Sequence, residues 1–430
     1  MIDEKEYKKR RERFAQELAC HSMAIFLSAP LKTRSNDTEY RYRQSSDFYY
    51  LTGFKEDNSA LVFLKKKKKT KVILFVQKRE KDLELWTGER LGKKRAKKRF
   101  MVDEVYIYDT LEKKMMEYKK DIKTFYYDFT LKNNIVEKLL LCSSFVAHKN
   151  IKNITRKMRL IKSPSEIALI KKAINISKEA HHKAMQIKKE KMYEYQLCAE
   201  MEYIFKKNGA YSEAYATIVA GGNNANTLHY INNDKPLKNG DLILIDAGAE
   251  YDYYASDITR TIPVNGKFTQ AQKELYNSVL DVECKIIKMV KPNIKRSTLQ
   301  KKAVELLTQA MVNLEILQGD VKELIKKEAY KKYYPHGIGH WMGLDVHDDA
   351  LYVDENNQEI KLKEGMILTI EPGIYIDKKD TSVPEKYRGI GIRIEDDILV
   401  TQDGYENLSA SIVKEIDAIE SMSHNYKSNQ

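Results

Sequence analysis

The sequence predicts a mixed α/β protein of two domains, and length, composition and hydrophobic pattern support this prediction. The chain has 430 residues, which is long for one domain. Hydrophobic residues make up 42% of it, which is enough to form buried cores. Short apolar runs suited to strands alternate with longer segments in which apolar residues recur at helical spacing. We expect an N-terminal domain over residues 1–155 and a larger domain over residues 156–430.

The first domain begins with a charged helix over residues 4–19 and a strand over residues 23–27. Two apolar runs, residues 61–64 and 72–76, follow further along the chain. They flank the lysine run Lys65–Lys69, so this segment is expected to be the turn of a β-hairpin.

The second domain begins with a strong helix-start signal. Ser163 is suited to the N-cap, Pro164 to the first helical position and Glu166 to the third. In the first part of this domain, two helices are followed by a strand and a hairpin. In the second part, two helices are followed by two strands. The repeated order suggests two related halves. Further helices are expected over residues 195–207, 269–289, 297–317 and 321–330. The tail after Ile412 ends in polar residues, and we expect it to fray.

The net charge of +13 raises the possibility of a nucleic-acid partner. Two basic clusters, Lys65–Lys69 and Lys93–Arg99, carry much of this charge, and they fit a hairpin turn and a solvated helix face. No run of aromatic residues accompanies them as a stacking platform. We therefore expect no nucleic-acid partner, and a basic nucleic-acid binder remains the alternative.

The sequence predicts a cytoplasmic protein without a membrane anchor. No apolar run approaches the length of a membrane span, and the charged N-terminus lacks an apolar signal core. The cysteines are scattered and form no CxxC pair, which favours reduced thiols over disulfides or a zinc knuckle. They are Cys20, Cys142, Cys198 and Cys284.

Two aspartates mark the first candidate site. Asp246 ends the apolar run Leu242–Ile245, and Asp257 precedes an alternating strand pattern. If the chain turns at Tyr251–Asp252, the two carboxylates face each other across a hairpin, where like charges are destabilising. A bound cation would remove that repulsion. The alternative is that one aspartate caps a turn and the other lies on a solvated edge.

Three later segments add similar signals. His336, His340 and His347 lie close together beside several glycines. Glu371 ends a second apolar run, and the run Gly391–Leu399 places Arg393 and Glu395 on one strand face. Carboxylates at the ends of apolar strands are costly without a partner.

Together these signals predict a centre for two divalent ions. The candidate ligands supply four carboxylates and one imidazole, a set that suits Mn²⁺, Co²⁺ or Zn²⁺. Two such ions bridged by carboxylates form a hydrolytic site. The candidate ligands are Asp246, Asp257, His340, Glu371 and Glu395.

The same segments resemble those of a known family. The blocks DAGAEYDYYASDITRT, HGIGHWMGLDVHD, TIEPGIY and GIRIEDD stand in the order typical of the pita-bread metallopeptidases, family M24. That family includes methionine aminopeptidase, prolidase and aminopeptidase P, and the resemblance is closest to aminopeptidase P. It covers nearly the whole chain and implies a pita-bread catalytic domain after a smaller mixed α/β domain.

The resemblance implies an activity and a role for each candidate. It implies hydrolysis of the N-terminal Xaa-Pro bond of peptides by a hydroxide that two metal ions activate, with Mn²⁺ as the first expectation and Co²⁺ or Zn²⁺ as the alternatives. Asp246 would bind one ion, Asp257 and Glu395 would bridge both, and His340 and Glu371 would complete the second. Glu371 would also carry a proton. The resemblance also implies roles for residues that are not ligands. His229 and His347 would hold the substrate carbonyl and the oxyanion, and His336 would line the proline pocket. Arg393 and Tyr375 would hold the other side chains of the site in place.

The block TRSNDTEY within the first domain is typical of aminopeptidase P. Asp37 matches an aspartate that approaches the active site in that family, and turn capping is the alternative. Trp86 is assigned either to packing or to a substrate pocket. A homo-oligomer, a dimer or a tetramer, is also expected from the resemblance.

Three alternative functions stay open at this point. Prolidase has the same ligands but cleaves only dipeptides. Non-catalytic pita-bread modules bind partners and typically lack ligands, whereas this chain has all five. A nucleic-acid binder would show a steep dependence of affinity on salt.

Overall fold

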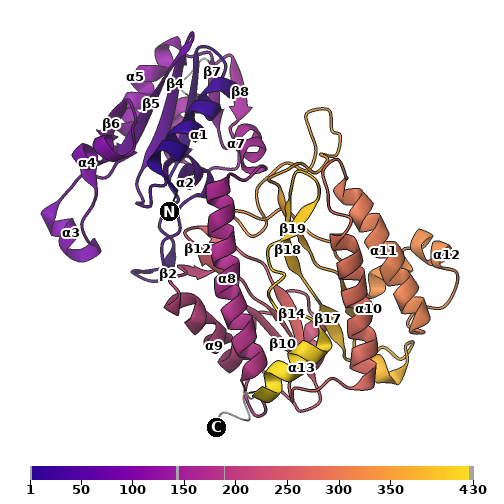
Figure 1. Ribbon diagram of the computed structural model, residues 1–430. Coiled ribbons are helices and arrows are strands. Elements are labelled where there is room, and N and C mark those ends of the chain that lie inside the picture. Colours follow the sequence, from indigo (N-terminus) through magenta and orange to yellow (C-terminus); the bar gives the residue numbers. More distant parts are fainter. Residues whose placement is uncertain (1, 142–144, 188, 426–430) are drawn as a thin grey trace. The chain divides into compact units, whose positions relative to one another are not determined.

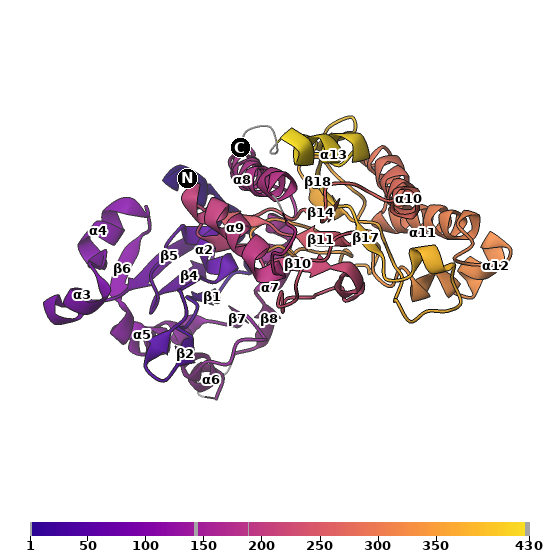
Figure 2. The same ribbon diagram turned by 90° about the horizontal axis from the view of Figure 1, so that it is seen from below.

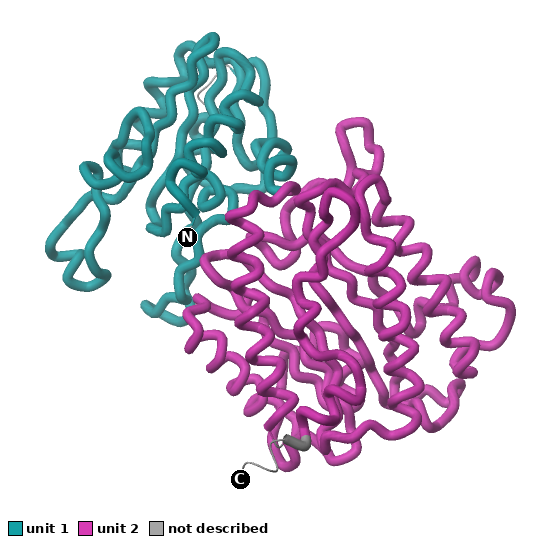
Figure 3. Tube along the Cα trace, viewed as in Figure 1, with its two compact units in different colours: residues 1–159 teal, residues 160–430 magenta. Residues whose placement is uncertain are grey.

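The structure is a computed structural model that describes residues 2–141, 145–187 and 189–425. The chain divides into two compact units, residues 1–159 and 160–430, coloured teal and magenta in Figure 3. Helix α7 (Lys152–Arg159) lies wholly in the first unit, so a boundary after residue 155 would divide a helix. The two units are described separately below.

The first unit is built on a six-stranded mixed sheet with the order β6-β5-β4-β1-β7-β8 (Figure 1). β4 pairs antiparallel with β1 and β5, whereas β6, β7 and β8 are joined by parallel pairing. The β4–β5 turn lies at Lys67, which has a φ of 52°, so the expected basic hairpin turn is confirmed. The strands of the sheet are β1 (Ser22–Leu27), β4 (Ala60–Lys66), β5 (Lys69–Val76), β6 (Glu104–Ile107), β7 (Thr124–Tyr127) and β8 (Ala147–Asn150). A separate hairpin consists of β2 (Thr33–Ser35) and β3 (Thr38–Glu39).

Helices cover both faces of this sheet, because successive strand residues point to opposite sides and both sides are apolar. On one face, the ring of Phe14 lies 5.0 Å from that of Phe26 and 4.7 Å from that of Phe63. On the other face, Leu111 and Val136 belong to a separate buried cluster. Besides α7, the helices are α1 (Glu4–Glu17), α2 (Ser46–Thr52), α3 (Lys81–Thr87), α4 (Gly92–Arg99), α5 (Leu111–Tyr118) and α6 (Asn134–Leu141).

The second unit contains several small antiparallel sheets. Their orders are β10-β11-β14, β13-β12-β9, β15-β18-β19 and β16-β17. The first strands are β9 (Ser212–Glu213), β10 (Ile218–Gly221), β11 (Leu242–Asp246), β12 (Ala249–Tyr251), β13 (Tyr254–Ala255) and β14 (Thr259–Pro263). The later strands are β15 (Ile367–Ile370), β16 (Gly373–Tyr375), β17 (Gly391–Arg393), β18 (Asp396–Val400) and β19 (Tyr405–Asn407).

The long helices of this unit lie along one side of its strands (Figure 2). They are α8 (Pro164–Gln186), α9 (Glu194–Lys207), α10 (Gln270–Ile287), α11 (Arg296–Asn313) and the C-terminal α13 (Ile416–Asn425), with the short α12 (Val321–Lys326) after α11. The expected start of α8 is confirmed. The Ser163 hydroxyl accepts from Glu166 N, the Glu166 carboxylate accepts from Ser163 N, and Pro164 is the first helical residue.

Two helices precede the strands in each half of the unit, and the two halves meet along their strands. Glu395 N donates to Thr259 O at 3.1 Å, and Thr261 Oγ1 donates to Arg393 O at 3.0 Å. These bonds join β14 of the first half to the β17–β18 segment of the second. The candidate acids of the two halves are therefore brought to one seam.

The expectation of a frayed tail after Ile412 is wrong for the described residues. Helix α13 packs through Ile416 and Ile419, which are three positions apart and buried. Tyr276 donates from its hydroxyl to Lys414 O at 2.7 Å and fixes the segment before the helix.

Cys20, Cys198 and Cys284 carry free thiols, and Cys142 lies outside the described residues. Within the described ranges, every helix is too short or too polar to cross a membrane.

Candidate active site

Asp246 ends the fully buried strand β11 and pairs with Thr259 of β14, not with Asp257. The predicted position opposite Asp257 is therefore wrong. The hairpin turns at Asp252 and Tyr253, whose φ angles are 48° and 73°, one residue later than expected. Two successive positive φ angles define a type I′ turn, whose twist suits a hairpin. A turn shifted by one residue moves every cross-strand partner by two.

Asp257 nevertheless lies on the same side of the hairpin as Asp246. The flanking hydrogen bonds place it opposite Gly248. A Cβ atom at Gly248 would lie only 1.8 Å from Ser256 O, so this close approach requires glycine. The backbone N–H of Asp257 donates to Asp397 Oδ2 at 3.1 Å, which fixes the loop that presents its carboxylate.

His340 is positioned by pairing of its segment with β15. Thr369 N donates to His340 O, and Glu371 N donates to Ile338 O, both at 2.9 Å. Gly339 allows this pairing, because a Cβ atom there would lie 1.9 Å from Thr369 O. Glu371 follows β15 directly, so the pairing brings its Oε1 to 3.8 Å from His340 Nε2.

Arg393 ends β17 and Glu395 lies just before β18, with both side chains on the cavity side as predicted. Thr259 Oγ1 donates to Glu395 Oε2 at 2.7 Å and accepts from Arg393 Nε at 3.0 Å. The Arg393 guanidinium also lies 2.5 Å from Asp246 Oδ2. Arg393 therefore fixes acids from both halves of the unit.

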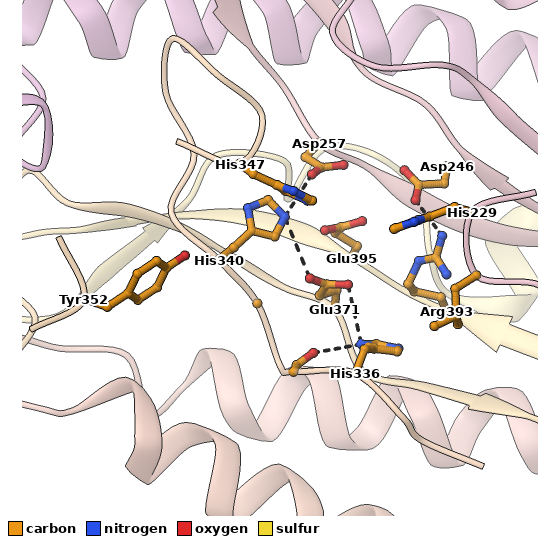
Figure 4. Close-up of a pocket in the computed structure, with 13 residues that line it drawn as sticks. His229, Asp246, Asp257, His336, His340, His347, Tyr352, Glu371, Arg393 and Glu395 are labelled. Atoms are coloured by element: carbon orange, nitrogen blue, oxygen red, sulfur yellow. Dashed lines mark hydrogen bonds and ion pairs between the residues drawn. The ribbon is translucent and has the colours of Figure 1, made fainter. Parts of the chain in front are cut away.

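These segments enclose a cavity of about 360 Å³ (Figure 4). It brings together all five predicted ligands and all but one of the other residues predicted for the site within the second unit. The predicted residues that line it are His229, Asp246, Asp257, His336, His340, His347, Glu371, Arg393 and Glu395. The exception, Tyr375, contacts two of them from behind.

The Tyr375 hydroxyl connects His336 to Arg393. His336 Nδ1–H donates to Gly337 O at 2.8 Å, so its Nε2 accepts from the Tyr375 hydroxyl, also at 2.8 Å. Arg393 donates to the same hydroxyl oxygen at 3.0 Å. Burial, together with the charge of Arg393, lowers the pKa of His336 to about 4 and keeps the ring neutral.

The acids of the cavity repel one another in a poorly solvated place. Burial raises the pKa of Asp246, and the Arg393 charge partly opposes this effect. Burial also raises the pKa of Glu371 to about 7 and that of Glu395 well above its usual range, and the nearby carboxylates add to the rise. A cation bound among them would favour their ionised forms.

The donor atoms fit such a cation. Asp257, His340 and Glu395 each offer one ligand atom, and these atoms lie within 4.8 Å of one another. His340 Nδ1–H donates to Trp341 O at 3.0 Å, which leaves Nε2 facing Asp257 Oδ2 at 3.2 Å. Burial lowers the pKa of His340, but the Asp257 hydrogen bond and charge outweigh it and raise that pKa to about 9. The site thus attracts positive charge to Nε2, the atom that a metal would take.

Two further histidines lie beside this group. The rings of His340 and His347 are in edge contact, with centroids 4.2 Å apart. Burial and the charge of His340 lower the pKa of His347. His229 is exposed and lines the cavity. Both can reach a substrate without being bound to the acids.

Several residues of the site were not predicted from the sequence. The Tyr215 hydroxyl donates to Asp246 Oδ1 at 2.6 Å, and Thr259 and Asp397 hold Glu395 and Asp257 as described above. Tyr352 lines the cavity (Figure 4). Thr259 lies within the aspartate block, so its polar side chain in a strand was a usable signal. The sequence around Tyr215 contains no comparable signal.

Asp37 and Trp86 belong to the first unit. Asp37 is exposed between β2 and β3, and the Trp86 side chain on α3 is 84% exposed. Packing in the core is therefore excluded for Trp86, and a substrate role for either residue remains a prediction.

Family models match both units of the chain. The model described as metallopeptidase family M24 matches residues 168–402, and that described as aminopeptidase P, N-terminal domain, matches residues 7–126. The chain is 40% identical to the Xaa-Pro aminopeptidases of Haemophilus influenzae and Escherichia coli, over 98% of its length and 97% and 98% of theirs.

Solved structures agree with these matches. A structure of aminopeptidase P from E. coli with the inhibitor Pro-Leu has 38% identity and a TM-score of 0.95, over 99% of each chain. Proline aminopeptidase P II from Yersinia pestis has 40% identity and a TM-score of 0.95, over 99% of this chain and 100% of its own. The fold, the acids and the full-length similarity together place this chain in metallopeptidase family M24, with the N-terminal domain of aminopeptidase P.

Proposed function

We propose that this chain is an Xaa-Pro aminopeptidase, which hydrolyses the bond between the first residue of a peptide and a following proline. The observation that carries the proposal is the convergence of four carboxylates and His340 on one cavity. The substrate class comes from the relatives named Xaa-Pro aminopeptidase, which match over nearly their whole length.

The cavity residues suit two divalent metal ions. Asp246 and Asp257 would hold one ion, His340 and Glu371 the other, and Asp257 and Glu395 would be shared. Mn²⁺ is our first choice, and Co²⁺ or Zn²⁺ also suits this oxygen-rich set. A solved structure of the E. coli enzyme is described as zinc-substituted, which supports tolerance of more than one metal. When bound, such ions lower the pKa of a water molecule so that hydroxide is available near neutral pH.

Glu371 is the residue that we propose to move the proton. Its carboxylate lies 3.8 Å from His340 Nε2 and 3.7 Å from His336 Nδ1, at the wall of the cavity. A carboxylate there can take a proton from the attacking water and deliver it to the leaving proline nitrogen.

The three histidines outside the ligand set would contact the substrate, and Arg393 would support a metal ligand. His229 and His347 line the cavity beside the acids, where they would donate to the substrate carbonyl and to the oxyanion that develops from it. His336, oriented by its hydrogen bonds with Tyr375 and Gly337, would line the proline site. Arg393 orients Asp246 and favours its ionised form.

Prolidase is the nearest rival, and a pair of substrates separates the two activities. The purified protein with added Mn²⁺ would be given the tripeptide Ala-Pro-Ala and the dipeptide Ala-Pro, and release of free alanine would be measured. We expect hydrolysis of the tripeptide. Hydrolysis of the dipeptide alone would identify a prolidase, and no hydrolysis of either would support a non-catalytic binding module.

The cellular compartment and the assembly state complete the proposal. We propose a cytoplasmic enzyme because its described cysteines are free thiols. We also propose a homo-oligomer, a dimer or a tetramer, which light scattering on the purified protein would test.

A further inference from the structure

His229 stands on a loop, residues 222–234, whose backbone decides where the imidazole lies. The loop follows β10 and begins with the 3-10 turn Gly222–Asn226. Leu228 and His229 both line the active-site cavity (Figure 4). The His229 side chain is exposed, so close packing does not hold the ring in place. The loop itself must therefore be fixed if the imidazole is to meet a substrate.

One buried carboxylate, that of Glu194, binds both ends of this loop. Glu194 is the first residue of α9, and it is fully buried. Its Oε1 accepts from Gly221 N, just before the loop, at 2.8 Å. Its Oε2 accepts from Lys235 N, just after the loop, at 3.0 Å. The two ends of the loop are thus held by the two oxygens of one side chain.

The same carboxylate also binds two side chains within the loop. Asn224 Nδ2 donates to Oε1 of Glu194, and the Tyr230 hydroxyl donates to Oε2, both at 2.8 Å. Asn224 Nδ2 also lies 3.1 Å from the Tyr230 hydroxyl oxygen, so the two side chains support each other. Tyr230 directly follows His229 in the chain. The Tyr230 hydroxyl bond is therefore the contact that connects Glu194 to His229.

The ring of Tyr230 is held by apolar packing as well. It is partly buried against a cluster that reaches the active-site cavity, because one member of the cluster, Tyr375, binds His336. The cluster consists of Ile218, Ala220, Ala225, Leu244 and Tyr375. Packing limits where the ring can lie, and the hydrogen bond to Glu194 sets its direction.

Glutamine cannot replace Glu194 in this arrangement. The four donors, two backbone N–H groups and two side chains, match the acceptor capacity of an ionised carboxylate. The amide nitrogen of glutamine donates and does not accept, so the two donors at that position would lose their partner. Glu194→Gln therefore keeps the shape of the side chain and releases part of the loop.

We propose that Glu194 is a positioning residue for the reaction, and that it acts through Tyr230 to hold His229 against the substrate carbonyl. This inference rests on the proposed aminopeptidase function and on the role of His229 in it. A side chain that only anchored α9 to β10 would stabilise the fold in the same way. Its loss would then have the same effect whether or not residue 229 is a histidine.

A double-mutant cycle distinguishes these two roles. kcat and KM on Ala-Pro-Ala would be measured with Mn²⁺ for Glu194→Gln and Tyr230→Phe, each alone and combined with His229→Ala. Tyr230→Phe keeps the packed ring and removes only the hydroxyl. The matched control is Tyr387→Phe, which removes a hydroxyl bond to Glu274 Oε2, at 2.6 Å, by a residue that does not line the cavity.

The expected result is a loss that depends on His229. Glu194→Gln should lower kcat/KM by about 10- to 100-fold and Tyr230→Phe by about 3- to 10-fold, within the loss of about 10²-fold expected for His229→Ala. In the His229→Ala background, each should change kcat/KM by less than about twofold, because the group that they position is gone. Tyr387→Phe should change it by less than about twofold in both backgrounds. The Mn²⁺ affinity, measured by calorimetry, should stay parental throughout.

Hydrogen exchange followed by mass spectrometry gives a second measurement, which does not depend on activity. Residues 222–234 should exchange faster in Glu194→Gln and in Tyr230→Phe, whereas α10 and α11 should keep the parental rate. Parental exchange of the loop in both variants would overturn the inference. If Glu194→Gln does not fold, Tyr230→Phe carries the same test, because its ring stays packed.

Equal losses in the parental and His229→Ala backgrounds would reduce Glu194 to an anchor of the fold and overturn the inference. A fall of Mn²⁺ affinity in step with kcat/KM would also overturn it, because the effect would then arise at the metal ligands. If the parent cleaves no Xaa-Pro peptide, the proposed function fails and the role of Glu194 fails with it. Cleavage by the parent with equal losses in both backgrounds removes only the role of Glu194.

Discussion

His181 ties helix α8 to the hairpin that carries Asp246, and its titration should be visible in the stability of the protein. The ring is 1% exposed, and its Nε2–H donates to Ala247 O at 2.9 Å, directly after Asp246. Burial lowers the pKa of His181 to about 3, and the bond to Ala247 opposes this only in part. In the unfolded chain the pKa should be near the ordinary value of about 6.5.

The size of the effect follows from these two values. Between pH 6.5 and 3 the unfolded chain binds a proton at His181 and the folded chain does not. The stabilisation is therefore complete above about pH 6.5 and is lost as the pH falls toward 3. Between pH 8 and pH 5 this one group should remove about 2 kcal/mol from the free energy of unfolding.

Denaturant unfolding of the parent and of His181→Gln at pH 8 and pH 5 tests this value. Glutamine keeps an N–H donor for Ala247 O but does not titrate. The buried Trp341 reports on the second unit by fluorescence, because the other tryptophan, Trp86, is exposed. Between pH 8 and pH 5, the free energy of unfolding of His181→Gln should fall by about 2 kcal/mol less than that of the parent. The control His182→Gln should differ less from the parent in this respect. Equal losses in the parent and in His181→Gln would refute the neutral buried ring.

Three further outcomes follow from the site. His347→Ala should keep its metal and lose activity by about 10²–10³-fold, the usual effect of removing an oxyanion donor; a parallel loss of metal would make His347 a ligand. Asp257→Asn should lose at least one ion in a Mn²⁺ titration, whereas Asp37→Asn should keep both, and parental metal affinity in Asp257→Asn would contradict the assignment. Lys162→Met should destabilise the chain by about 3–5 kcal/mol in thermal melts, because it leaves the buried Asp348 without the ammonium 3.1 Å away. The double variant with Asp348→Leu should recover much of this loss, and no recovery would show that the pair is not coupled.

Local sequence signals were sufficient where one short segment determines the structure. The Ser163–Glu166 capping box set the start of α8, because its hydrogen bonds are between residues three apart. The acids at the ends of apolar strands identified the cavity, since a carboxylate there needs a partner that the segment itself lacks. Glu371 and Glu395 both line it.

Features of the site that depend on contacts between distant segments were not predicted. Tyr215 binds Asp246 from a segment without regular pattern, so only the fold brings the two together. The hairpin register was wrong because the turn could begin at either of two adjacent positions. The positive φ angles of Asp252 and Tyr253 decide it, and neither residue type requires them. An error of one residue in the predicted turn therefore gave the wrong partner for every residue of the two strands.

The central claim is that the acids and His340 bind two metal ions that the peptidase activity requires. The most direct measurement is a Mn²⁺ titration of the metal-stripped protein by calorimetry, with hydrolysis of Ala-Pro-Ala recorded at each point. We predict binding of two ions per chain, no hydrolysis before the first addition, and hydrolysis that rises as the ions bind. Full activity of the metal-free protein, or hydrolysis that does not follow metal binding, would contradict the account.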